Sequence, residues 1–307
     1  LVSDFATGKV YNSSNSPISS ALLNPGVQKV TGLATDSKGN TWVLNPETHN
    51  ALKVKTPNDE WYSFSIGNDN QKMVDLLIDD SEQKWVAQNG QGIIVYKEGE
   101  NLSASGEQKI TLTTNGNQGN LPNNSVLSMA LDKNGEVWVG TAQGIAVFSC
   151  PSRIFDATST CRISDRITST LDLYTEYLFE TDRVSAIEVD GANRKWIGTS
   201  AGVFLMSEDG KEEILSFNAE NSPLPNTEIY DITVNKFNGE VFIFTSGGMV
   251  SYMGDATEPA ENYENIKAYP NPVRPEYTGP IAIEGLISDS YVKITDTHGV
   301  LIKEGYA

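Results

Sequence analysis

The sequence is poor in the residues that most often support catalysis and metal binding. Its 307 residues include only two histidines and two cysteines, which leaves too few ligands for a zinc site and no obvious general base for a serine triad. No apolar run approaches the roughly 18 residues that a membrane-spanning helix requires. We therefore predict no catalytic centre, no metal site, no cofactor and no transmembrane segment in this chain.

Positive charge is scarce as well. The chain has 22 lysines and arginines against 40 aspartates and glutamates, a formal net charge of -18. A charge of this sign repels phosphate backbones and anionic lipid headgroups, so we predict no nucleic acid partner. The acidic residues are spread along the chain, which favours a solvated surface over a dedicated cation-binding face.

One unit recurs five times along the chain. It occupies residues 30–45, 73–96, 126–148, 184–206 and 229–252. Its central aromatic residues, spaced by 43, 53, 58 and 46 positions, are Trp42, Trp85, Trp138, Trp196 and Phe242. Apolar residues within each unit crowd into short runs, as expected of strands between neighbouring blades. Periods of roughly 40–50 residues built from short strands predict an all-β fold, a β-propeller with five recognisable blades of about four strands each.

Each unit also contains turn signals. Four aspartates stand six positions before the tryptophan of their unit, namely Asp36, Asp79, Asp132 and Asp190. An aspartate bonds to the backbone of the turn that it starts, and a Gly or Asn three residues later accepts the positive φ of a tight hairpin. Asn235 stands one residue further from Phe242, which predicts a longer turn in the last unit. A second turn is predicted at Gly92, Gly144, Gly202 and Gly248.

Polar segments rich in Asn, Ser and Pro precede the first strand of three units, at residues 12–20, 117–125 and 218–226. We interpret them as blade-to-blade connections on one rim of the propeller. Loops on such a rim are free to carry binding residues.

The longest interruption of the repeat is an insertion at residues 149–182. Its two cysteines, Cys150 and Cys161, would form a disulfide in a secreted protein and remain thiols in the cytosol; the indications of export favour the disulfide. The aromatic residues Tyr174, Tyr177 and Phe179 are candidates for a partner-binding patch. A strand or small subdomain packed on the rim is the favoured alternative for this segment.

The repeat ends after Tyr252, and we place the β-propeller at residues 1–262 and the incomplete start of an Ig-like β-sandwich at 263–307. Residues 281–286 predict one strand of this module, and residues 292–294 are expected to pair with Leu301. Residues 1–12 resemble the outer part of a blade. We interpret the chain as a piece of a longer protein, whose propeller is completed by these strands or by sequence outside it. Closure at five, six or seven blades stays open.

Three patterns mimic functional sites. Residues 198–202 match the G-x-S-x-G motif, but here a strand leads to a strand, whereas the nucleophile elbow joins a strand to a helix. Asp132, Asn134 and Glu136 have the alternate spacing of a calcium loop without its twelfth-position glutamate, so we interpret them as a turn. We expect Arg194, the arginine that lies inside a repeat, to be a solvent-facing turn residue rather than a ligand clamp.

Several segments of the sequence resemble known protein families. The phrase D-x-x-G-x-x-W-x-G-T-x-x-G at residues 132–144, with the connector NSPLPN at 221–226, resembles the two-component-regulator propeller repeat of hybrid histidine kinases and surface proteins of Bacteroidetes. A second resemblance, which covers nearly the whole chain, is to the C-terminal part of the PorZ family of the type IX secretion system. It is carried by residues 190–199, 251–258, 269–279 and 292–302.

The PorZ resemblance implies a secreted protein on the outer face of the outer membrane, with two propellers followed by a sorting-type β-sandwich. Members of that family assist the sortase that removes C-terminal sorting signals and attaches cargo to lipopolysaccharide. The resemblance therefore implies a binding and scaffolding function, with a sortase-type secretion component and lipopolysaccharide or another glycan as partners. The alternatives are a periplasmic propeller that senses a glycan-derived ligand for a two-component system and, less favoured, a carbohydrate-active enzyme.

Overall fold

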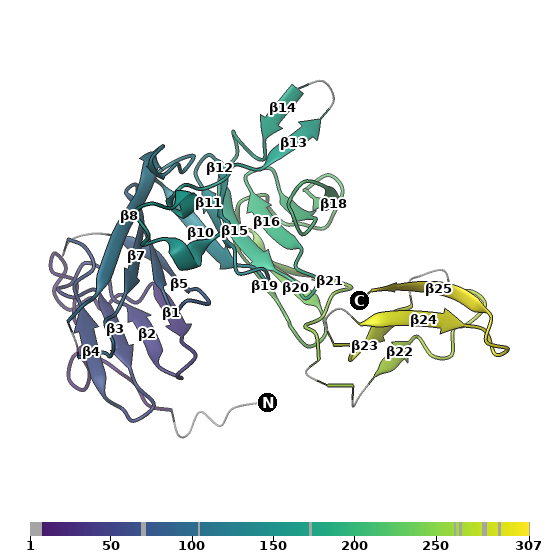
Figure 1. Ribbon diagram of the computed structural model, residues 1–307, viewed down its shortest axis with the longest axis horizontal. Helices are drawn as coiled ribbons and strands as arrows, with labels where there is room; N and C mark the ends of the chain where they lie inside the picture. The colour runs from purple at the N-terminus through teal and green to yellow at the C-terminus, as the bar shows by residue number, and fades with distance from the viewer. Residues whose placement is uncertain are drawn as a thin grey trace.

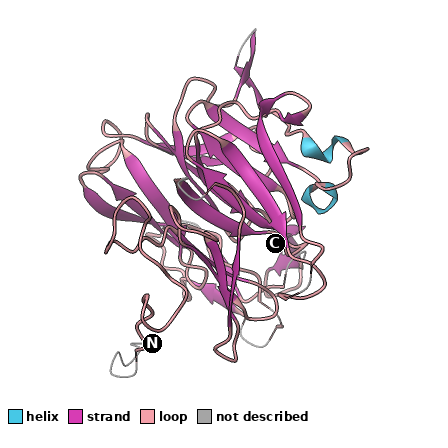
Figure 2. Cartoon of the chain, turned by 90° about the vertical axis from the view of Figure 1, so that its left-hand side faces the viewer, coloured by secondary structure: helices cyan, strands magenta, loops and turns pink. Residues whose placement is uncertain are grey.

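Short strands form nearly all of the regular structure, as the repeats predict. The computed structural model describes residues 8–68, 72–103, 105–171, 174–260, 262–263, 266–277, 281–287 and 290–306. Within these residues the only helical segments are two 3-10 turns, η2 (Pro151–Arg153) and η3 (Thr160–Arg162), which lie on one side of the molecule (Figure 2). The fold is therefore all-β.

Five antiparallel sheets follow one another along the chain, one for each repeat, and we call them blades 1 to 5. Blade 1 consists of β1 (Gly32–Thr35), β2 (Thr41–Leu44), β3 (Leu52–Lys55) and β4 (Trp61–Phe64). Blade 2 consists of β5 (Met73–Ile78), β6 (Lys84–Gln88), β7 (Gly92–Lys97), β8 (Gln108–Asn115) and β9 (Gln118–Gly119). Blade 3 consists of β10 (Val126–Leu131), β11 (Val137–Thr141) and β12 (Gly144–Phe148).

Blade 4 consists of β15 (Val184–Val189), β16 (Lys195–Thr199), β17 (Val203–Met206) and β18 (Glu213–Phe217). Blade 5 consists of β19 (Ile229–Val234), β20 (Glu240–Thr245) and β21 (Gly248–Met253). In every blade, strands that are adjacent in sequence are paired. Each repeat thus forms one meander, the supersecondary unit of a propeller.

The blades pack side by side through their first strands. β1 packs on β5, β5 on β10, β10 on β15, and β15 on β19, so the sheets are arranged in chain order (Figure 1). The apolar core consequently lies between blades: one cluster joins Trp42 of blade 1 to Leu76 and Ile94 of blade 2. The other repeat tryptophans occupy similar clusters, and all four indoles are at most 1% exposed. Large buried aromatic side chains therefore hold each blade to the next.

Blade 5 ends the series differently. Phe242 takes the place of the tryptophan and is only half-buried. Phe244, Met249 and Met253 are 36%, 56% and 62% exposed, although side chains at comparable positions in earlier blades are covered by the next blade. Among the described residues no further blade covers this face.

The expected strand at residues 1–12 is not found where the structure can test it. Residues 1–7 lie outside the described residues, and residues 8–12 form no strand. Instead, Lys9 Nζ and Tyr11 Oη donate to the carboxylate of Asp59 at 3.0 and 3.2 Å, and the Tyr11 ring packs edge-on against Trp61. Side-chain contacts rather than a strand ladder attach this segment to the edge of blade 1.

The turn between the first two strands of a blade is fixed by its aspartate. In blade 1, Asp36 Oδ1 accepts hydrogen bonds from the backbone N–H groups of Lys38 and Asn40, at 3.0 and 2.9 Å. Asp36 Oδ2 accepts a hydrogen bond from Trp42 Nε1 at 2.8 Å. The same carboxylate–indole bond joins Asp79 to Trp85 at 2.8 Å and Asp132 to Trp138 at 3.1 Å. The turn was predicted from the sequence, but the bond to the indole was not.

The other turn predictions are confirmed. Gly39, Gly135 and Asn193 have positive φ angles of 77°, 75° and 58°, which is the conformation that these residue types adopt at least cost. In blade 5 the turn is longer, because Gly239 N–H donates to Asn235 O rather than to a residue three positions before it.

Two buried lysines connect blades through the same tryptophans. Lys84 of blade 2 places its Nζ 4.1 Å from the ring centroid of Trp42, and Lys195 of blade 4 places its Nζ 4.7 Å from that of Trp138. Lys195 Nζ also lies 2.9 Å from Asp132 Oδ2, and both side chains are fully buried. A buried ammonium paired with a carboxylate and an aromatic face is well satisfied, so these lysines reinforce the order of the blades.

The chain continues into four short strands, β22 (Lys267–Tyr269), β23 (Ala282–Glu284), β24 (Tyr291–Thr295) and β25 (Leu301–Tyr306). β22 pairs with β23 and β24 with β25, and both sheets lie beyond blade 5 in Figure 1. The two predicted strands do pair, but the predicted register is wrong: Leu301 lies opposite Thr295, and Ile294 lies opposite Lys303, because the register shifts between Ile294 and Thr295. The two sheets occupy the region where the sequence predicts a partial β-sandwich, and β23 is shorter than the predicted strand at 281–286.

The substitution Asp79→Ala tests the carboxylate–indole bond. It leaves Trp85 Nε1 and the turn amides of blade 2 without their acceptor, so we expect the free energy of unfolding to fall by about 2–4 kcal/mol. Urea unfolding monitored by fluorescence measures the change. Asp80→Ala, which removes the neighbouring exposed carboxylate, is the matched control and should have little effect. Equal losses in the two variants would contradict a special role for Asp79.

Candidate functional site

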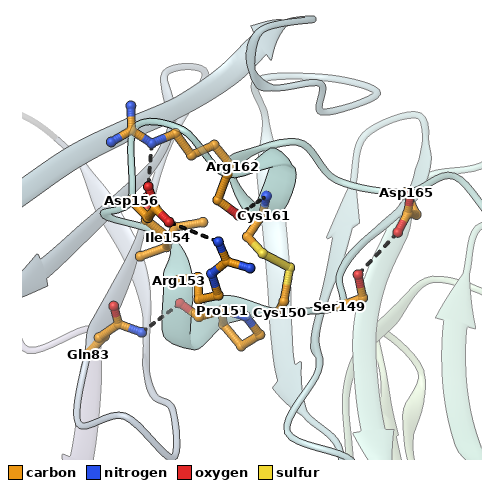
Figure 3. Close-up of a disulfide and its surroundings, with 11 residues drawn as sticks. Gln83, Ser149, Cys150, Pro151, Arg153, Ile154, Asp156, Cys161, Arg162 and Asp165 are labelled. Carbon is orange, nitrogen blue, oxygen red and sulfur yellow. Dashed lines mark hydrogen bonds and ion pairs between the residues drawn. A yellow bond between two sulfur atoms is a disulfide. The ribbon is translucent and has the colours of Figure 1, made fainter.

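The first half of the insertion fastens blade 2 to blade 3. Cys150 and Cys161 are joined by a disulfide with a Cα–Cα distance of 5.3 Å, between η2 and η3 (Figure 3). Pro151 O accepts a hydrogen bond from Gln83 Nε2 in the β5–β6 turn at 3.0 Å. Asp165 and Val147 exchange backbone hydrogen bonds at 2.8 and 3.0 Å, so the insertion provides a short substitute for a fourth strand of blade 3.

The second half of the insertion is a projecting hairpin, whereas the favoured alternative predicted a strand or small subdomain packed on the rim. It consists of β13 (Thr168–Leu171) and β14 (Tyr174–Tyr177) and stands away from the blades (Figure 1). Tyr177 is 43% exposed, and the guanidinium carbon of Arg166 lies 4.4 Å from its ring centroid. Tyr177 therefore presents an aromatic surface to solvent.

The other two aromatic candidates differ from Tyr177. The Phe179 ring is partly buried and packs against Phe204 of blade 4, with ring centroids 4.9 Å apart. It therefore contributes to packing. Tyr174 belongs to β14, but its side chain lies outside what the structure describes.

A cleft of about 430 Å³ lies between the outer parts of blades 1 and 2. Tyr62 supplies an aromatic face, and the wall also contains Glu60, Glu98, Glu100 and amide, hydroxyl and amine groups. Glu98 is held in place because Lys84 Nζ lies 2.6 Å from its Oε2. This cleft was not predicted from the sequence, because its lining residues come from two different repeats.

Acidic residues lie on the innermost strands. Asp75 of β5 accepts hydrogen bonds from the backbone N–H of Leu76 at 2.8 Å and from that of Met129 in blade 3 at 3.1 Å. Burial raises the pKa of Asp75 to about 6, and the charge of Asp231 in blade 5 adds to the shift. Burial also raises the pKa of Asp231 and of Glu188. Carboxylic acids of this kind are candidates for pH-dependent behaviour.

The patterns that mimic catalytic and metal sites have structural explanations. Ser200 lies in the turn from β16 to β17, and its Oγ donates to Asp182 Oδ1 at 3.2 Å. Asp132 Oδ1 accepts from the N–H groups of Asn134 and Glu136, as a turn aspartate does. Within the described residues no three His, Cys, Asp or Glu side chains gather as metal ligands. None of the described helical segments has the length and apolar character needed to cross a membrane.

Arg194 does not face solvent as the sequence predicted. Its side chain is only 16% exposed; its Nε lies 2.8 Å from Asp190 Oδ2, and its Nη2 lies 2.6 Å from Asp255 Oδ1. The expectation of a solvent-facing turn residue failed because Asp255 comes from beyond the repeats. The signal that could have found it is the residue type: the corresponding turn position holds Asn40, Gln83 and Glu136 in the first three blades.

Comparison with known proteins finds a matching family model and solved structures with a similar fold. A family model described as two component regulator propeller matches residues 120–143. PorZ of Porphyromonas gingivalis, described as an essential bacterial surface component of the type IX secretion system, is similar over 97% of this chain, with 26% identity and a TM-score of 0.72. The chain carries a two-component regulator propeller repeat and resembles PorZ.

Other solved structures share the fold. Two extracellular domains from B. thetaiotaomicron, assigned to hybrid two-component systems, are 20% and 17% identical over 80% and 78% of this chain, with TM-scores of 0.50 and 0.51. At this identity the likeness shows the fold alone. No curated protein matches the chain. The chain spans 42% of the PorZ chain and 30% and 28% of the other two.

Removal of the disulfide tests whether the insertion is a clamp. The bridge closes a loop between residues 11 positions apart, so we expect reduction to lower the free energy of unfolding by about 2–3 kcal/mol. Thermal unfolding with and without reductant measures the loss. The control is the double variant Cys150→Ser/Cys161→Ser, whose stability should equal that of the reduced protein and should not respond to reductant. No effect of reductant on the native chain would overturn the prediction.

The raised pKa of Asp75 predicts that the free energy of unfolding depends on pH. Its native pKa of about 6 lies above the value of about 3.9 for an unfolded aspartate, so the native state binds the extra proton in this range. The contribution of Asp75 to stability is therefore largest in acid and falls by about 2 kcal/mol as the pH rises from about 4 to about 7.

In Asp75→Asn this component should be missing, and the slope between these pH values should be smaller than in the native chain. Urea unfolding at a series of pH values measures both slopes. Asp80→Asn, which removes an exposed carboxylate, should keep the native slope. An unchanged slope in Asp75→Asn would show that other groups control the pH dependence.

Proposed function

We propose that this chain is a non-catalytic binding and scaffold propeller of a secreted protein on the bacterial surface, where it acts in type IX secretion. The observation that carries the proposal is the similarity to PorZ, which extends over 97% of the chain at a TM-score of 0.72 and so includes both the blades and the strands after them. The Cys150–Cys161 disulfide supports a location outside the cytosol, where such bonds persist.

The surface that best suits a protein partner is the β13–β14 hairpin. It projects from the junction of blades 3 and 4 (Figure 1), and Tyr177 with the stacked Arg166 lies at its base. Tyrosine and arginine are enriched in the energetically important parts of interfaces. A short exposed hairpin also offers free strand edges to another chain. We infer that it contacts a sortase-type secretion component, with lipopolysaccharide or another glycan as a further partner of the protein.

A second candidate function is ligand sensing for a two-component system. The cleft between blades 1 and 2 favours it, because Tyr62 offers a ring face and Glu60, Glu98 and Glu100 offer acceptors for hydroxyl groups. Pockets that combine an aromatic face with a few fixed polar groups suit small polar ligands. A glycan fragment is the ligand class that this lining fits best.

A gene replacement in the source bacterium tests the proposed function. Loss of the gene should leave C-terminal sorting signals uncleaved on secreted cargo, as detected by mass spectrometry of the culture and the cell surface. Complementation with the native gene should restore cleavage. A variant with residues 169–176 replaced by Asn-Gly should fold with native stability and fail to restore cleavage, because the partner-binding hairpin is gone.

Phe237→Ser is the control for this experiment, because it removes a side chain that is 92% exposed in a turn of blade 5, away from the hairpin. It should restore cleavage fully. Normal cleavage in the strain without the gene would overturn the secretion proposal. If that strain instead loses a transcriptional response to glycans, and Tyr62→Ala reproduces the loss, the sensing function is the correct one.

A further inference from the structure

A short segment after blade 5 lies across the turns of the preceding blades. It follows β21 directly and comprises residues 254–258, which we call the strap. Gly254 N–H donates to Gly239 O at 3.1 Å, and Glu258 N–H donates to Lys236 O at 3.0 Å. Ala256, between these two bonds, is 9% exposed. Both ends of the strap are thus bonded to the β19–β20 turn of blade 5.

Charged side chains extend the strap to blades 4 and 3. Asp255 Oδ1 accepts a hydrogen bond from Arg194 Nη2 in the blade 4 turn at 2.6 Å. Glu258 is paired with Lys133 in the blade 3 turn and lies 3.7 Å from Lys236 Nζ. Each of these partly exposed ion pairs is weak alone. Together with the two backbone bonds, they define one docked position across three successive turns.

Gly191 provides the space that the strap occupies. A Cβ atom built on Gly191 would lie 1.8 Å from Thr257 O, so any side chain there would push the strap away. The corresponding positions of the other four turns hold Ser37, Asp80, Lys133 and Lys236. Blade 4 therefore departs from the repeat at two positions: Gly191 leaves space for the strap, and Arg194 binds to it.

Arg194 also takes the carboxylate oxygen that holds the tryptophan in other blades. Its Nε donates to Asp190 Oδ2 at 2.8 Å, whereas in blades 1 to 3 the equivalent oxygen accepts from the indole. Trp196 Nε1 is buried and has no hydrogen-bond partner among the residues that the structure describes. A buried donor without an acceptor destabilises the state that contains it, so the docked strap is opposed by a bond that Trp196 could make.

We propose that the strap docks reversibly and that Asp190 Oδ2 passes between Arg194 and Trp196 as it does so. In the docked state Arg194 bridges Asp190 and Asp255. When the strap leaves, Arg194 loses Asp255, and Trp196 takes the carboxylate as its counterparts do in blades 1 to 3. Ala260, two residues after the strap, donates its N–H to Leu286 O at 2.8 Å, which links the strap to the strands after blade 5. The exchange couples their position to the packing between blades 4 and 5.

Two variants of the full chain test the proposal from opposite sides. Gly191→Ala displaces the strap by its volume and changes no charge. Arg194→Asn removes the bridge to Asp255 and recreates the Asp36–Asn40–Trp42 arrangement of blade 1 in blade 4. Gly116→Ala is the control, because nothing lies within 4 Å of a Cβ at that position.

Each variant is examined by two NMR measurements. Amide hydrogen exchange reports the bonds of Gly254 and Glu258, and the indole ¹H–¹⁵N signal of Trp196 reports its hydrogen bond. In both variants we expect exchange at these amides to be about tenfold faster and the Trp196 signal to move toward those of Trp42, Trp85 and Trp138. Gly116→Ala should change neither.

The remaining outcomes overturn the proposal in distinguishable ways. Unchanged exchange in both variants would show that the strap is held by contacts other than Arg194 and the space at Gly191. Faster exchange with an unmoved Trp196 signal in Gly191→Ala would show that Arg194 keeps Asp190 whether or not the strap is docked. Neither result depends on the proposed secretion function, because neither measurement needs a partner.

Discussion

The hydrogen bond from a buried indole to the carboxylate of its own hairpin turn, made in blades 1 to 3, is the interaction on which the packing of these blades depends. One oxygen of Asp36 holds the turn amides and the other holds Trp42, so the local turn fixes the orientation of the ring. That ring then packs against the following blade. The same aspartate therefore stabilises both a hairpin turn and, through its tryptophan, the contact with the next blade. Loss of the turn would weaken that contact, so neighbouring blades are expected to unfold cooperatively.

The residue four positions after each turn aspartate decides what else the carboxylate supports. In blade 1 this is Asn40, which stays within the turn. In blade 2 it is Gln83, whose amide also reaches Pro151 and thereby holds the insertion. In blade 4 it is Arg194, which reaches Asp255 in the strap. One position of the repeat thus varies to attach the segments that are not repeated, while the aspartate itself keeps the turn.

The repeats, the turns and the C-terminal hairpin could be predicted from the sequence because they are set by interactions over a few residues: Gly39 and Asn193 are required by local φ angles. The regular spacing of six positions between Asp and Trp indicates that the two side chains are related. Spacing alone does not show that a carboxylate oxygen accepts a hydrogen bond from the indole. The partners of Arg194 and the cleft beside Tyr62 could not be predicted. Both are formed by segments far apart in sequence, whose meeting depends on the packing of whole blades.

The arrangement explains why binding is better assigned to the attached segments than to the blades. The surfaces between consecutive blades are occupied by tryptophans that are almost fully buried, so a partner could reach these surfaces only by separating the blades. The insertion is different, because its disulfide half carries the attachment to blades 2 and 3. The β13–β14 hairpin is therefore not needed for this attachment, and Tyr177 can stay exposed. A rigid base that fixes a projecting hairpin lowers the entropy lost on binding, which is a physical argument for the proposed role of this hairpin in recognition.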